Sequence, residues 1–489
     1  MVTLLRAALL SSTCMICLGI AGLGSALRPA LAGDPPLAAS RPNVLFIMAD
    51  DLGHAHLGCY GQTKIATPNI DRLAAEGLRF TQAYAGCSVC APCRSVLMTG
   101  YHMGHTPVRA NMGAVPLFDA DVSVAEVLKG GGYATGCFGK WGLGEDGSEG
   151  VPYKQGFDEF FGYLHQVHAH FYYPDYLWEN DRRFVLEGNA DGGRDRYAHD
   201  EIVDRALDYL RRQSTSDEPF FCYVPVTIPH VELVVPEDSL APYRGKFDEV
   251  PIDDPRQGYI DADEPFATYA GMISRMDRDV GRLVAALDEL GIAENTLVIF
   301  TSDNGAQGGG PWQPLLETFD GNGRLRGSKG SMYEGGIRAP LIARWKGTIE
   351  PGRTSDVPCY FADVMPTLAE LAGPDAQQRV PDDIDGQSLL PVLAGAEQLE
   401  GESPRFLYWE LGSGQRLAQA VRWGKWKAVR LRSKAPLELY DLSADESESD
   451  NIAAEQPDVV ATIEVYLKTA RTAPRQQVAP TPPEGQRYR

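Results

Sequence analysis

The stretch RPNVLFIMADD, residues 41–51, decides the fold of this chain. Residues 44–49 are continuously apolar, which is typical of a strand buried on both faces of a sheet, and the run stops at Asp50 and Asp51. The stretch NTLVIFTSDNG, residues 295–305, repeats this pattern and ends in Asp303 and Asn304. Because ligands bind outside the carboxyl ends of strands in open α/β sheets, we expect both strand ends to meet at one site.

The residue types at these strand ends indicate a cation site. Buried carboxylates are costly unless a cation or hydrogen bonds compensate their charge. All four side chains offer oxygen and none offers sulfur or imidazole, so the expected ion is hard, Ca²⁺ or Mg²⁺ rather than Zn²⁺. The alternative interpretation is a pair of ordinary turns or helix caps.

The segments between and after these strands predict the domain organisation. Helical patterns at residues 67–80 and 197–213 alternate with strands, which is typical of an α/β domain, and 44% of the 489 residues are hydrophobic. After residue 400 the pattern changes to short strands with turns and a helix near 459–470. We therefore expect a catalytic domain at 41–398, a smaller C-terminal α+β subdomain at 399–474 and a loose tail at 475–489.

The first 32 residues predict export. A basic start at Arg6 precedes an apolar run over residues 7–27, and Ala30 and Ala32 form an A-x-A cleavage site. We expect a signal peptide at 1–32 and a periplasmic or secreted protein, with an uncleaved membrane anchor as the alternative because the run is long. No later segment is long and apolar enough to span a bilayer, so we expect no membrane span in the mature chain.

The charge excludes one class of partner. The formal net charge is −21, whereas nucleic-acid phosphates require a basic footprint. An anionic substrate must therefore be held locally by a few cations, with or without a metal ion.

Three cysteines lie at three-residue intervals in GCSVCAPCRSVLMTG, residues 86–100. With His102 and His105 they could form a zinc clip, but an arginine directly after the last thiol would compete with the metal. A nucleophile fits better. Pro92 suits the first position of a helix that ends at Gly100, so Cys90 would lie just before a helix N-terminus, which favours an anion.

The pentapeptide at residues 90–94, CAPCR, resembles the C-x-P-x-R signature of the type I sulfatases, in which the first cysteine is oxidised to formylglycine. The resemblance extends from about residue 41 to 345 through the blocks NVLFIMADDLG, TPNIDRLAAEG, LMTGYHMGH, YATGCFGKWGLG, SDNG and LRGSKGSMYEGGIRAP. It implies the fold of the alkaline-phosphatase superfamily, with a large mixed β-sheet flanked by helices and a smaller C-terminal subdomain.

The resemblance also implies roles for individual residues. Ca²⁺, in preference to Mg²⁺, would be bound by Asp50, Asp51, Asp303 and Asn304, with oxidised Cys90 completing the site. Arg94 would steady the formylglycine. The sulfate would be held, and the leaving group protonated, by Lys140, His230 and Lys329.

The implied chemistry needs the aldehyde. Hydration of formylglycine gives a geminal diol, one hydroxyl of which attacks sulfur as the alcohol leaves. The sulfated diol then expels sulfate by collapsing to the aldehyde. A formylglycine-generating enzyme is therefore an expected partner for maturation.

Three positions depart from the family pattern. Cys93 stands where serine or alanine is usual, which could impair maturation or allow a disulfide with Cys87 or Cys90. Gly142 replaces a frequent histidine, and Glu232 replaces the proline that often follows the histidine at position 230. For the missing histidine, the run HQVHAHFYYP offers three hypothetical substitutes, His165, His168 and His170.

The substrate is expected to be a sulfated carbohydrate, with aryl sulfates as artificial substrates. The run HFYYPDYLW, residues 170–178, and Trp312 offer aromatic faces that stack on sugars, although such runs are also found in cores. The alternatives are a phosphonate monoester or phosphodiester hydrolase of the same superfamily, and a catalytically silent carbohydrate-binding relative.

Overall fold

The two acid-terminated stretches form neighbouring parallel strands, as the sequence predicts. In the computed structural model, which describes residues 37–111, 115–252, 262–399 and 404–476, they are β1 (Asn43–Ala49) and β9 (Thr296–Ser302). Their register runs from Asn43 beside Thr296 to Ala49 beside Ser302, so both strands end at the same level. The expected signal peptide and residues 477–489 of the expected tail lie outside the described residues.

Ten strands form one mixed sheet around this pair. The central strands are parallel, and antiparallel neighbours join toward both edges. The order is β11 (Arg353–Ser355), β2 (Leu78–Phe80), β10 (Leu341–Trp345), β9, β1, β8 (Phe220–Pro225), β4 (Ala134–Lys140), β5 (Glu159–Tyr163), β6 (Tyr176–Glu179) and β7 (Arg182–Val185). The α/β fold class with a large mixed sheet is confirmed.

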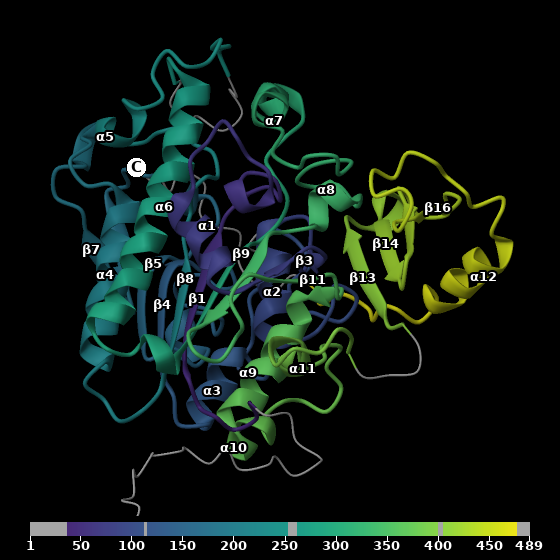
Figure 1. The fold of residues 1–489 in the computed structure, drawn as a ribbon, viewed down its shortest axis with the longest axis horizontal. Coiled ribbons are helices and arrows are strands. Elements are labelled where there is room, and N and C mark those ends of the chain that lie inside the picture. Colours follow the sequence, from purple (N-terminus) through teal and green to yellow (C-terminus); the bar gives the residue numbers. More distant parts are fainter. Residues whose placement is uncertain (1–36, 112–114, 253–261, 400–403, 477–489) are drawn as a thin grey trace, which may run out of the picture.

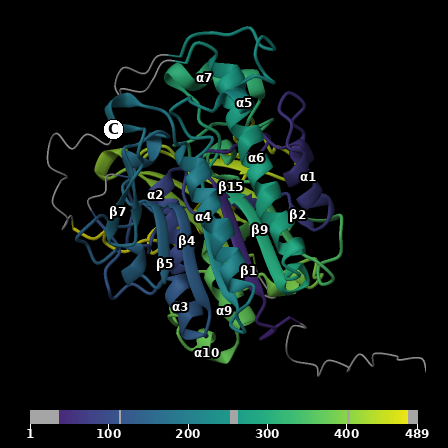
Figure 2. The same cartoon turned by 90° about the vertical axis from the view of Figure 1, so that its left-hand side faces the viewer.

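Helices cover both faces of the sheet. The side chains of β1 point alternately to the two faces and pack into two separate hydrophobic clusters. Val44, Phe46 and Met48 belong to one hydrophobic cluster, and the residues between them belong to the other. The first face is covered by α2 (Cys90–Thr99), α3 (Val124–Gly130) and α9 (Val364–Ala372). The second is covered by α1 (Pro68–Ala75), α4 (Ala198–Gln213) and α6 (Pro265–Glu289), as Figures 1 and 2 show.

The C-terminal part forms the expected small α+β unit beyond the first helical layer (Figure 1). Its antiparallel sheet consists of β13 (Phe406–Leu411), β14 (Ala418–Trp423), β15 (Trp426–Arg430) and β16 (Glu438–Asp441), followed by α12 (Pro457–Tyr466). The Nε1 of Trp409 donates to the carbonyl of Ala85 at 2.9 Å, so the small sheet packs directly against the segment that leads into α2.

The remaining elements are short. They are β3 (Ala83–Tyr84), which pairs with β12 (Cys359–Tyr360), and the helices α5 (Glu237–Leu240), α7 (Gln313–Phe319), α8 (Glu334–Ile337), α10 (Pro374–Gln377) and α11 (Leu390–Leu393). Among the described residues, no helix has the length and apolar character needed to cross a bilayer.

The start of α2 corrects one expectation. The helix begins at Cys90, with the extended Val89 as its N-cap, and not at Pro92. The N–H of Cys93 bonds to the carbonyl of Val89 at 3.2 Å, so the first helical turn starts at residue 90. Pro92 is tolerated in this turn because the N–H groups of a first turn have no intrahelical partner. The helix ends at Gly100 in the left-handed conformation, as expected.

Candidate active site

The ends of β1 and β9 place four oxygen-bearing side chains together. Asp50, Asp51, Asp303 and Asn304 are all fully buried. The backbone N–H of Asp51 donates to Oδ1 of Asp303 at 3.2 Å, and Nδ2 of Asn304 donates to Oδ1 of Asp51 at 2.8 Å. Asp51 also has a φ of 65°, a strained conformation that is typical of functional positions. The structure therefore brings these four predicted residues together.

Helix α2 supplies Cys90 and Arg94 to the same cluster. The Sγ of Cys90 lies 3.2 Å from Oδ1 of Asp50. One guanidinium nitrogen of Arg94 lies 2.8 Å from Oδ2 of Asp303, and another donates to the carbonyl of Lys140 at 2.5 Å. Cys90 and Arg94 are four residues apart, one helical turn, and both point to the strand ends.

Two lysines and a histidine complete the cluster. Lys140, the last residue of β4, places its Nζ 2.6 Å from Oδ2 of Asp50. The Nζ of Lys329 lies 2.7 Å from Oδ2 of Asp51, and Nε2 of His230 lies 3.5 Å from the same oxygen. All nine predicted site residues, Cys90 included, thus lie in one cluster.

The carboxylates of this cluster have strongly perturbed pKa values. Burial and the charge of Asp50 raise the pKa of Asp303 to about 7. Burial also raises the pKa of Asp51. Burial alone would raise the pKa of Asp50, but the charges of Lys140 and His230 outweigh it and hold the pKa well below its usual value. Such opposed shifts within one buried group are typical of functional sites.

The donor set fits a hard cation. Four oxygen-bearing side chains converge here, with Cys90 and His230 at the edge of the group, and Oδ1 of Asn304 has no hydrogen-bond partner among the described residues. Buried polar atoms without partners are rare in folded proteins, so this oxygen is available as a ligand. A metal ion there would also offset the repulsion that raises the pKa of Asp303.

Comparison with known proteins assigns the family. A family model described as Sulfatase matches residues 42–374, and a second, described as N-sulphoglucosamine sulphohydrolase, C-terminal, matches residues 327–473. The chain belongs to the sulfatase family. It is a type I sulfatase of the alkaline-phosphatase superfamily and therefore a sulfuric ester hydrolase, as the sequence motifs predicted. The family has in general a metal site and a formylglycine.

Its relatives include enzymes and solved structures of similar size. The sulfatase is 34% identical to arylsulfatase A of Homo sapiens, with 87% of each chain covered. It is 32% identical to N-acetylgalactosamine-6-sulfatase of Canis lupus familiaris, covering 85% of this chain and 74% of the other. It also resembles a solved structure described as Ps i-CgsB in complex with k-i-k-neocarrahexaose, with a TM-score of 0.74, 26% identity and coverage of 88% and 93%.

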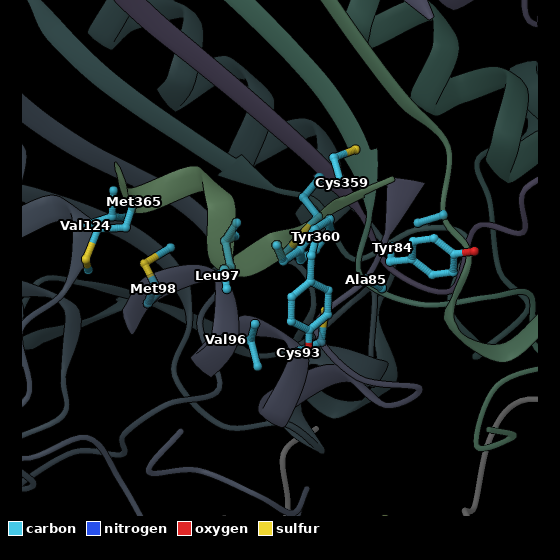
Figure 3. Packing of buried hydrophobic residues seen from close by; sticks show 14 of the residues in the cluster. Tyr84, Ala85, Cys93, Val96, Leu97, Met98, Val124, Cys359, Tyr360 and Met365 are labelled. Atoms are coloured by element: carbon cyan, nitrogen blue, oxygen red, sulfur yellow. The ribbon is translucent and has the colours of Figure 1, made fainter. Parts of the chain in front are cut away.

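The three clustered cysteines of the sulfatase point into different surroundings. Cys93 lies in the hydrophobic core near Tyr360, as Figure 3 shows, and accepts a hydrogen bond from the N–H of residue 86. The thiol of Cys87 lies 3.8 Å from the carbonyl of Glu410. Cys90 alone faces the acidic cluster. The zinc-clip alternative is therefore wrong, and the described cysteines are all free thiols.

The two histidines of that alternative form a separate hydrogen-bonded group. The Nδ1 of His102 accepts from the N–H of Gly104 at 3.0 Å, so its proton is on Nε2, which lies 3.4 Å from Oδ1 of Asp385. The Nδ1 of His105 lies 2.9 Å from the other carboxylate oxygen. These contacts tie the turn after α2 to residue 385.

The backbone at the position of the missing histidine disfavours a side chain. Gly142 has a φ of 78°, and a Cβ there would meet Nε2 of Gln166 at 1.9 Å. Of the three hypothetical substitutes, His165 lies 3.2 Å from a carboxylate oxygen of Glu145, and His168 packs between tyrosine rings. Only the ring of His170 stacks on a predicted site residue.

Proposed function

We propose that this sulfatase hydrolyses sulfate esters of carbohydrates, using a formylglycine formed from Cys90 and a Ca²⁺ ion. One observation carries the proposal: the thiol of Cys90 lies 3.2 Å from Asp50, in a cluster of three carboxylates and four basic side chains. Asp50, Asp51, Asp303 and Asn304 would hold the cation, together with the oxidised residue 90.

The basic residues of the cluster bind the anionic part of the substrate. Lys140 places its ammonium group against Asp50 and Lys329 places its own against Asp51, so two positive charges are available to a bound sulfate group. Arg94 is held by Asp303 and by the carbonyl of residue 140, so its guanidinium is fixed next to residue 90. Preorganised charges of this kind stabilise the charge that develops on a transferring group.

Two groups supply chemistry that ordinary side chains lack. A formylglycine at position 90 would supply a hydrated aldehyde as the nucleophile, and a Ca²⁺ ion held by Asp50, Asp51, Asp303 and Asn304 would favour ionisation of its hydroxyl. His230 donates a proton to the leaving oxygen. Burial and the charge of Lys329 lower the pKa of His230, but a bound sulfate ester adds negative charge that favours the protonated ring.

The proposed substrate class rests on relatives, because most of the aromatic side chains that were expected to stack on sugars are buried, namely Tyr172, Tyr176, Trp178 and Trp312. The names of the dog enzyme and of the solved structure refer to N-acetylgalactosamine 6-sulfate and to a neocarrahexaose, both carbohydrates. The aromatic segment that ends at β6 flanks the site through His170. We propose sulfated carbohydrates as natural substrates and aryl sulfates as artificial ones, with the protein exported to the periplasm or the medium.

Two measurements test the reaction. Peptide mass spectrometry across residue 90, after coexpression with a formylglycine-generating enzyme, should detect conversion of the thiol to the aldehyde. The same protein should hydrolyse 4-nitrophenyl sulfate faster than bis(4-nitrophenyl) phosphate. Faster hydrolysis of the diester would favour a phosphodiester or phosphonate monoester hydrolase, and an unmodified Cys90 in active protein would falsify the formylglycine mechanism.

Calcium is expected to stabilise the protein. Adding Ca²⁺ at 100 times its Kd to EDTA-treated protein should raise the free energy of unfolding by about 2.7 kcal/mol, because the cation binds only the folded cluster. Thermal unfolding followed by circular dichroism measures the shift. The Asp51→Asn variant, which loses one charged ligand, should show a smaller shift. Stabilisation by Zn²⁺ and not by Ca²⁺ would contradict the proposed metal.

A further inference from the structure

Two loops beside the cluster are held together by hydrogen bonds. The N–H of Glu232 donates to the carbonyl of His170 at 3.3 Å. The hydroxyl of Tyr172 lies 3.1 Å from the carbonyl of Thr227 and within hydrogen-bonding distance of the carbonyl of His230. Residues 170–172 and 227–232 therefore form one fixed unit, although they are far apart in the sequence.

Within this unit the imidazoles of His170 and His230 stack. Their ring centroids are 4.2 Å apart and the ring planes differ by 27°. The Nδ1 of His230 donates to the carbonyl of Val231, which leaves Nε2 directed at Asp51. The ring of His230 is thus fixed at one edge by a hydrogen bond and on one face by His170.

We propose that His170 is a positioning residue that holds Nε2 of His230 toward the leaving oxygen of the substrate. The inference rests on the proposed sulfatase reaction and on His230 as proton donor. In that step a bond forms between sulfur and a hydroxyl oxygen of residue 90, and the bond between sulfur and the ester oxygen breaks. The ester oxygen takes the proton from Nε2 of His230 and leaves as the alcohol.

The surroundings single out His170 from its neighbours in the HQVHAH run. His165 lies 3.2 Å from Glu145, and His168 is fully buried with its ring centroid 5.0 Å from Tyr163 and 4.7 Å from Tyr176. Burial lowers the pKa of His170, and so do the charges of His230, Lys140 and Lys329. His170 therefore lies close enough to both lysines to interact with them. His170 is also partly exposed, so it lies at the rim of the cluster.

The stack predicts which substitutions are tolerated. A phenyl ring can stack on His230 as an imidazole does, whereas alanine removes the ring and leaves the face of His230 uncovered. His170→Phe should therefore keep most of the wild-type kcat, and His170→Ala should not. His165→Ala is the matched control from the same segment and should leave kcat unchanged.

The leaving group distinguishes a positioning role from general damage. Proton donation matters most when the alcohol is a poor leaving group, and general acids contribute roughly 10²–10⁴-fold to rate. In full-length, formylglycine-containing protein, His170→Ala should lower kcat on phenyl sulfate by about tenfold or more. On 4-nitrophenyl sulfate, with its better leaving group, the loss should stay within about threefold.

Each outcome of this comparison is decisive. Equal losses on both substrates, or a loss in His170→Phe as large as in His170→Ala, would overturn the proposal. If the alanine variant does not fold, His170→Gln replaces it in the same comparison. Wild-type protein that hydrolyses neither sulfate would refute the proposed activity on aryl sulfates. If the wild type is active and the His170 variants match it on both substrates, only the role of His170 is refuted.

Discussion

Cys90→Ala is expected to abolish sulfate-ester hydrolysis. The substitution removes the only residue whose side chain can become the formylglycine at the centre of the proposed site. Loss of a nucleophile lowers kcat by several orders of magnitude in enzymes of this type, and we expect at least about 10⁴-fold here. Initial rates on 4-nitrophenyl sulfate, with and without coexpressed formylglycine-generating enzyme, measure the effect. The folded state should persist, because a small side chain replaces a thiol of moderate size.

Cys93→Ala is the matched control for this experiment. Cys93 lies on the same helix but in the hydrophobic core, with its sulfur 3.2 Å from the backbone nitrogen of residue 86. Its substitution should keep activity within a few-fold and leave the conversion of residue 90 intact, at a modest cost in stability. Strong loss of activity in Cys93→Ala together with full activity in Cys90→Ala would reverse the assignment of the reactive thiol.

Lys427→Met is expected to cost the most stability. Lys427 lies on β15 and is fully buried, with its Nζ 3.0 Å from Glu334 and 2.9 Å from Glu448. Removing the ammonium leaves the buried Glu448 without its basic partner, whereas Glu334 keeps Arg338 at 2.6 Å. Breaking a buried ion pair in this way costs about 3–5 kcal/mol, so the free energy of unfolding in urea should fall by that amount.

The neighbouring Lys425 provides the matched control. It pairs with Asp441 at 2.5 Å, but half of its side chain is exposed, so Lys425→Met should change stability by less than about 1 kcal/mol. Adding Glu448→Gln to Lys427→Met should restore part of the loss, because one uncompensated charge is removed. Similar losses in Lys425→Met and Lys427→Met would contradict the importance of burial.

Lys427→Met should also impair catalysis. Glu334 begins α8, and the carbonyl of Gly336 in the same helix accepts a hydrogen bond from the N–H of Gly305, next to the oxygen ligands at the end of β9. The segment before α8 carries Lys329, whose N–H bonds to the carbonyl of Ala306. A shift of α8 would therefore displace both Gly305, next to the ligands at the end of β9, and Lys329. We expect KM on aryl sulfates to rise as a result.

The core of the site could be predicted from the sequence because its signals are local. Apolar runs that end in Asp50-Asp51 and Asp303-Asn304 mark two strand ends, and parallel pairing brings such ends together. The spacing of Cys90 and Arg94 predicts a shared helical face, which the structure confirms. In these cases the side chains that interact lie on elements whose pattern fixes their direction.

The remaining contacts depend on tertiary packing and leave little trace in the sequence. A lysine at position 427 in the alternating run WKAVRL is compatible with a solvated strand face, and its buried partner lies 93 residues away. Similarly, three histidines in HQVHAH look equivalent, and only the folding of their loop against residues 227–232 separates His170 from the others. The start of α2 also depended on the extended backbone of Val89.

The packing of the small C-terminal sheet against the approach to α2 sets an order of events during synthesis. Trp409 contacts Ala85, and Lys427 pairs with Glu334 at the start of α8, so the packing beside the segment that leads into α2 is complete only after the last strands have been made. Translation at about 5–20 residues per second leaves Cys90 outside a finished fold for on the order of tens of seconds. We therefore expect Cys90 to stay accessible to the proposed formylglycine-generating enzyme until the chain is almost complete.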